Sequence, residues 1–145
     1  MKAAIIHARL LLGTYRSDKY VSKYSGGSEA CSLPGCSAAV GDIVHLLSGA
    51  CPALRPKLQE TTTRSLNLLR PHTFLYQQVL KALTQPPDVC VKFLLDPSTV
   101  PEIIAYKQSY GLKSIYPPFK VSRSIIRCMH REHYRLKGLS RYLSI

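Results

Sequence analysis

Four residues with metal-binding side chains lie within 21 residues in the N-terminal third of the chain: Cys31, Cys36, His45 and Cys51. Their spacing is C-x4-C-x8-H-x5-C, a set of three thiols and one imidazole. Zinc accepts such a set as a closed tetrahedron, with Zn–S bonds of about 2.3 Å and Zn–N bonds of about 2.0 Å. Because the protein fills all four positions, none is left for a catalytic water. The pattern therefore predicts one structural Zn²⁺.

The residues between these ligands favour the turns that such a site requires. Pro34 and Gly35 occupy the central positions of a predicted type II turn, which folds the chain back between the first two thiols. Asp42 is the predicted N-cap of a short helix that carries His45 in its first turn, and Gly49 ends that helix. Each ligand thus lies at a turn or a helix end.

Two other states of the cysteines stay open at this level. The three cysteines could be ordinary buried thiols beside a hydrogen-bonded core histidine, or two of them could form a disulfide. Five cysteines is an odd number, and His7 and Arg9 interrupt the first apolar run before it forms a secretory signal. We therefore expect an intracellular protein, nuclear or cytoplasmic. Cys90 and Cys128 have no neighbour at ligand spacing and are predicted to be buried thiols.

A second group of chemically active side chains lies near the C-terminus. Basic residues recur there every three or four positions, which places them on one face of a helix that turns about 100° per residue. Arginine favours bidentate phosphate contacts, and a tyrosine on the same side can stack on a base. The predicted nucleic-acid contacts are Lys120, Arg123, Arg127, Arg131, Tyr134 and Arg135.

Two alternatives compete with nucleic-acid binding by this helix. It could be an ordinary solvated face, but residues 120–141 hold seven bases against Glu132 alone, whereas a merely soluble helix mixes both signs. It could also lie on a membrane surface, but only Phe119 offers the large aromatic group that this requires. His130 and His133 lie three residues apart and are predicted to be surface groups.

Composition is consistent with a basic globular protein that binds a polyanion. The chain has a formal net charge of +12 at pH 7 and is 46% hydrophobic, so it has enough apolar surface for a core. It has no glycine-rich phosphate loop, no GxSxG or HExxH motif and no adjacent aspartates. We therefore expect no enzyme activity and no small-molecule substrate. No apolar run reaches the roughly 18 residues of a membrane span.

Helical periodicity predicts a mostly α fold, with a small zinc knuckle followed by a basic helical region. Helices are expected over residues 2–12, from Pro52 or Pro56 through 69, and over 71–83, 88–95, 101–110 and 119–143. The expected division is an N-terminal helix and loop over 1–24, the zinc knuckle over 25–58 and a helical basic region over 59–145.

Several segments together resemble a known family. They are KA at 2–3, ARLL at 8–11, GTYR at 13–16, CSLPGC at 31–36, GDIVHLL at 41–47 and CPAL at 51–54. They look like the region that follows the polymerase domain in reverse transcriptases of non-LTR (LINE-type) retrotransposons. The specific part covers residues 2–58. Beyond it the similarity is limited to LLDPS at 94–98 and, in the final helix, to Arg123, Cys128, Met129, His130 and Arg131.

The resemblance implies a zinc knuckle that uses Cys31, Cys36, His45 and Cys51 and that assists the binding of element RNA or target DNA. The family's polymerase activity resides in an upstream domain with paired aspartates, which this sequence does not contain. The chain accordingly looks like a truncated or fragmentary open reading frame. The alternative prediction is a small helical protein-interaction domain whose basic surface serves only solubility.

Overall fold

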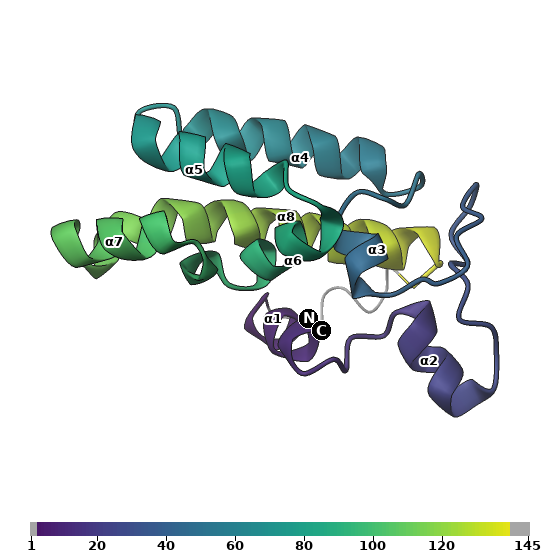
Figure 1. Cartoon of the computed structure of the whole chain (residues 1–145). Coiled ribbons are helices and arrows are strands. Elements are labelled where there is room, and N and C mark those ends of the chain that lie inside the picture. The colour runs from purple at the N-terminus through teal and green to yellow at the C-terminus, as the bar shows by residue number, and fades with distance from the viewer. Residues whose placement is uncertain (1–2, 140–145) are drawn as a thin grey trace.

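The computed structural model describes residues 3–139, and the mostly α prediction is confirmed for them, since they contain no strand (Figure 1). The elements are α1 (Ala3–Leu11), α2 (Asp18–Ser25), α3 (Ile43–Leu47), α4 (Arg55–Leu68), α5 (Thr73–Leu83), α6 (Pro87–Leu95), the 3-10 turn η1 (Pro97–Thr99), α7 (Pro101–Tyr110), the 3-10 turn η2 (Leu112–Ile115) and α8 (Tyr116–Leu136).

Helix α8 is the central element of the fold. It begins earlier than the predicted residue 119 because Pro117 and Pro118 occupy its first turn, where a missing N–H costs no hydrogen bond. Helices α1, α3, α4, α5 and α6 all pack against it, and Figure 1 shows α4 running alongside it. Its buried side includes Val121, Ile125 and Met129, which lie four residues apart and so form one apolar row.

Replacing Met129 by alanine is expected to destabilise the fold. The side chain is 0% exposed at the centre of α8, so its loss removes buried apolar surface and leaves a cavity. Large-to-alanine changes at such positions cost about 2–5 kcal/mol. Urea unfolding measures this difference, and the exposed Leu12→Ala, at a position 76% exposed, is the control. A loss below about 0.5 kcal/mol, the usual range of surface substitutions, would contradict the central role of α8.

The N-terminal elements share one hydrophobic core with the later helices. Ile6 and Leu10 of α1, Leu46 of α3 and Phe93 of α6 belong to the same buried cluster as Met129. Helix α1 contacts α6 and α8, and α3 contacts the same two helices. The expected boundary at residue 58 lies inside α4. The metal-binding region and the basic helix are therefore held in one packed unit.

Helix α2 lies in a segment for which the sequence predicted no helix. Ser17 caps its N-terminus by accepting a hydrogen bond from the Tyr20 N–H, at 3.3 Å. It ends at Gly26, whose φ of 70° suits glycine in the left-handed region. The helix has only eight residues, most of them polar and none buried, so the segment holds too few apolar residues to indicate a helix.

No helix among the described residues is both long enough and apolar enough to cross a membrane. The longest described helix, α8, has an apolar row on its buried side and charged residues on its exposed side.

Candidate metal centre and basic surface

The four predicted metal ligands come together in the folded chain. One donor atom from each of Cys31, Cys36, His45 and Cys51 lies within 4.8 Å of every other. The Cys31 and Cys51 sulfurs are 3.9 Å apart, and the Cys36 sulfur is 3.3 Å from His45 Nε2. Zn–S bonds of about 2.3 Å at tetrahedral angles place two sulfurs about 3.8 Å apart. The donor set therefore fits a tetrahedral metal ion.

The predicted turns position the first three ligands. The N–H of Cys36 donates to the Leu33 carbonyl, at 3.2 Å, and Gly35 has a φ of 75°, which confirms the turn between the first two thiols. An Asp42 carboxylate oxygen accepts the His45 N–H at 2.9 Å and so caps α3. The cap fixes the imidazole in the first turn of the helix, facing the thiols.

The fourth ligand lies just before α4. The Cys51 carbonyl accepts hydrogen bonds from the N–H groups of Leu54 and Arg55, at 3.2 and 3.0 Å. The Arg55 guanidinium reaches back to the carbonyls of Gly49 and Ala50, at 2.9 and 3.2 Å. These bonds tie the last ligand to the helix that packs most extensively on α8.

Burial sets the electrostatics of the site. Cys31 is 7% exposed and Cys51 is 0% exposed, whereas Cys36 and His45 are half-buried. Removal from water raises the pKa of the Cys31 thiol to about 12, because a thiolate loses its hydration there. A bound cation supplies the charge that lets such a thiol give up its proton. The site thus suits a metal ion better than free thiolates.

Asp18, which sequence reasoning missed, connects the loop that holds Cys31 and Cys36 to α2 and to the end of α8. Asp18, in the first turn of α2, accepts hydrogen bonds from the Ser32 N–H at 2.9 Å and from Lys137 Nζ at 2.6 Å. Burial opposes ionisation of this carboxyl, but the bonds from Lys137 and Ser32 lower its pKa overall. Gly41 leaves room for this contact, since a Cβ there would lie 3.2 Å from Asp18 Oδ2 and 2.9 Å from Cys31 Cα.

The basic residues of α8 point outward as predicted, and α4 adds to them. The side chains of Lys120, Arg123, Arg127, Arg131 and Arg135 are all exposed. A groove of about 350 Å³ between α4 and α8 is lined by Arg127 and Arg131 together with Lys57 and Arg64 of α4. Glu60 and Glu132 also line it, so bases outnumber acids by four to two. We call the five α8 residues the arginine face.

The expected role of Tyr134 in base stacking is wrong. This tyrosine is 6% exposed, and its ring lies against the His130 ring with centroids 4.3 Å apart. His130 and His133 are also buried, at 2% and 0% exposure, and are not surface groups. Tyr15, which follows α1, bonds to both histidines and covers this side of α8. The position of a residue around the helix axis does not show that a segment more than 100 residues away in the chain covers it.

The two remaining cysteines lie outside the metal cluster. Cys90 is buried in α6, as predicted. Cys128 is only half-buried, unlike the prediction, because it lines the groove between α4 and α8, where its thiol donates to the Lys57 carbonyl at 3.5 Å.

Comparison with known proteins gives no relative for this chain. No family model matches it, and no curated protein or solved structure matches it. The resemblance to retrotransposon reverse transcriptases therefore stays a prediction, and the function is argued from the site.

Proposed function

We propose that the chain is a zinc-stabilised nucleic-acid-binding module with no polymerase activity of its own. By its resemblance it would serve as the region that follows the polymerase domain of a non-LTR retrotransposon reverse transcriptase, and its partner would be RNA or DNA. The observation that carries the proposal is the arginine face, a row of exposed cations on the helix that the whole fold holds in place.

Most charges of the arginine face are available to a ligand. Within residues 3–139, ion pairs join Lys57 to Glu60, Arg135 to Glu132 and Lys137 to Asp18. Arg123, Arg127 and Arg131 have no carboxylate within bonding distance in that part of the chain. Their guanidinium groups can therefore bind phosphates without first breaking an intramolecular pair.

Zinc is the metal we propose for the four-ligand cluster. Three thiolates and an imidazole are soft or borderline donors, which favour zinc over magnesium or calcium. The metal's role would be structural, because the protein fills all four coordination positions. Its binding would fix residues 31–51 against α2, α4 and the end of α8, and so support the surface that binds nucleic acid.

Replacing Arg127 and Arg131 together by glutamine is expected to weaken binding to any nucleic acid without affecting the fold. Phosphate contacts release counterions, so the plot of log affinity against log salt should become flatter by about 1 to 2 units for two lost contacts. Fluorescence anisotropy with labelled single strands and duplexes over a range of salt measures this slope.

The matched control removes two charges elsewhere on the surface. Lys107 and Lys113 are exposed residues in α7 and η2, and their double glutamine variant should leave the salt slope of the parent nearly unchanged. If the two variants behave alike, the arginine face is only a solvated surface. Binding that hardly depends on salt would instead favour the protein-interaction alternative.

A further inference from the structure

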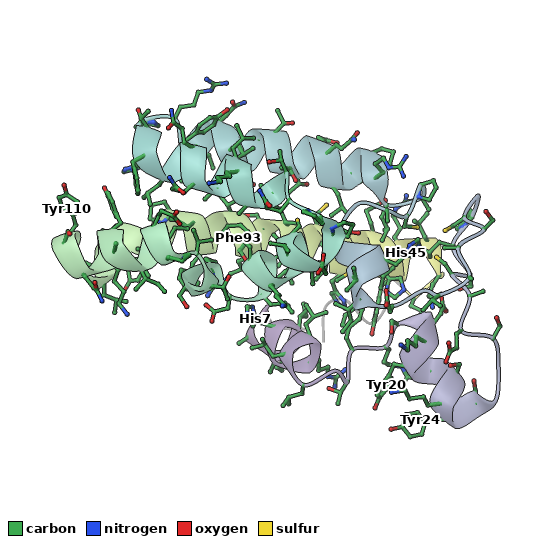
Figure 2. All side chains as sticks on the ribbon, in the orientation of Figure 1. His7, Tyr20, Tyr24, His45, Phe93 and Tyr110 are labelled. Carbon is green, nitrogen blue, oxygen red and sulfur yellow. The ribbon has the colours of Figure 1, made fainter. Side chains whose placement is uncertain are left out.

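Helix α2 carries two tyrosines that do not belong to the hydrophobic core. Tyr24 is 77% exposed, and Tyr20, one turn earlier, is half-buried. Their ring centroids are 5.2 Å apart with planes inclined by 58°, and both rings project from the same side of the helix (Figure 2). Most of the Tyr24 ring and part of the Tyr20 ring therefore stay in contact with water, and neither ring adds to the core.

The attachment of α2 leaves this aromatic side open. The helix is held through its first turn, where Asp18 bonds to Ser32 and Lys137, and the Lys19 N–H donates to the Gly41 carbonyl at 3.2 Å. None of its eight residues is buried. A helix this short is marginal in water, so its capping and anchoring indicate that its position is maintained despite the lack of core contacts.

The charge around the tyrosines is positive. Arg16, Lys19 and Lys23 are exposed on and beside the helix. The helix's one carboxylate, Asp18, is already engaged by Lys137. None of these three cations forms an ion pair with another residue of 3–139. Aromatic rings beside such cations suit a ligand that carries both flat rings and phosphates, and this charge complementarity favours a nucleic acid over an apolar peptide.

We propose that Tyr20 and Tyr24 form a stacking platform for the unpaired bases of a single-stranded nucleic acid, with Arg16, Lys19 and Lys23 contacting its phosphates. Stacking requires an accessible base face, which a single strand offers and the interior of a duplex does not. The inference rests on the proposed function and specifies its ligand. The bond between Lys137 and Asp18 joins α2 to the end of α8, so the platform is fixed relative to the arginine face.

The first test replaces both tyrosines by leucine, which keeps bulk and helix propensity but removes the rings. Base–aromatic stacking contributes about 1–3 kcal/mol per base, so affinity for labelled oligothymidylate and oligouridylate should fall about tenfold or more. Affinity for a blunt duplex should change by less than about twofold. The salt slope should stay that of the parent, because no phosphate contact is lost.

The matched control is Tyr110→Leu in α7, which removes a ring that is 71% exposed at the far end of the molecule (Figure 2). It should bind single strands as the parent does. Equal losses in the two variants, or no loss in the α2 variant, would overturn the platform. Because the Arg127 and Arg131 variant tests the arginine face separately, failure of the platform and failure of nucleic-acid binding as a whole are distinguishable.

A second measurement detects stacking directly. The chain has no tryptophan, so Tyr24→Trp introduces a single fluorescent probe on α2. Oligothymidylate should quench its emission, whereas inorganic polyphosphate, which has charge but no bases, should not. Equal quenching by both would assign α2 to phosphate contacts alone. A blue shift of the emission with anionic lipid vesicles, without quenching by the oligonucleotide, would assign it to a membrane surface, and either result would overturn the proposal.

Discussion

Protein produced with zinc is expected to contain one equivalent of the metal, and Cys36→Ser is expected to lose it together with the structure of residues 31–51. Cys36 is only half-buried, so serine changes the packing little and acts mainly through the metal. Metal binding in zinc-finger peptides contributes about 10–16 kcal/mol of apparent free energy, which is also folding energy because the ligands are scattered in the unfolded chain.

Elemental analysis and amide hydrogen exchange together measure the two effects. In Cys36→Ser, exchange should accelerate throughout residues 31–51, while α5, α6 and the first half of α8 keep most of their protection. Cys128→Ser is the matched control, since that thiol is half-buried but lies outside the cluster, and it should retain the metal. Well-folded parent protein without zinc would contradict the proposed centre.

The metal centre was predictable because its determinants are local in the sequence. All four ligands lie within 21 residues, and the turn at Pro34 and Gly35 and the cap at Asp42 each involve neighbours a few positions apart. Short-range preferences of this kind act whatever the rest of the fold does. The same reason explains why most helix boundaries were close: proline and glycine mark them within one or two residues.

The features that sequence reasoning missed all depend on distant contacts. Asp18 bonds to Lys137, 119 residues away, and Tyr15 covers His130, 115 residues away. Helix α2 escaped prediction because it is short and mostly polar, and because Asp18 anchors it through bonds to Ser32 and Lys137, which lie far along the chain. On α8 the angular position of each residue correctly grouped the arginines on one exposed face. It also put Tyr134 on that face, but the segment around Tyr15 covers this side of the helix, and Tyr134 is buried.

A buried cluster of Tyr15, His130 and His133 is expected to make the fold sensitive to acid. The Tyr15 hydroxyl lies 2.9 Å from His130 Nδ1 and 3.1 Å from His133 Nδ1. Two neutral histidines of opposite tautomers satisfy it, one ring accepting its hydrogen and the other donating to its oxygen, whereas two charged rings could not, since neither could accept. Within the described residues the Nε2 atoms of His130 and His133 are buried without a hydrogen-bond partner. If either ring became charged, its Nε2–H would therefore have no acceptor.

The surroundings of the cluster lower the pKa of both histidines from 6.5 to about 4. Burial is the main cause, because it disfavours the charged imidazolium. The nearby charges of Arg131 and Arg9 add to the effect at His130, and that of Lys137 adds to it at His133, where Asp18 opposes it.

The sign of the pH dependence follows from these lowered values. Between pH 4 and 6.5 the unfolded chain binds protons that the folded histidines do not, so the free energy of unfolding falls as the pH falls. Each histidine contributes a slope of up to about 1.4 kcal/mol per pH unit, and about 3 kcal/mol over the whole window. The contribution is fully present above pH 6.5 and is lost once the pH reaches about 4.

His133→Asn isolates this effect, because the amide stands near the position of Nδ1 and can bond to the Tyr15 hydroxyl but does not titrate. Urea unfolding at several pH values should show a lower stability at neutral pH and a flatter slope between pH 4 and 6.5, by about 1 kcal/mol per pH unit. His72→Asn, at an exposed position, should keep the parent's slope. Acid also releases zinc, which lowers the stability of every variant. All variants are therefore compared at the same excess of metal, so that the effect of metal release on the slope is the same in each and cancels from the difference between them. Identical slopes for His133→Asn and the parent would mean that the pKa of His133 is the same in the folded and the unfolded chain, which would contradict this prediction.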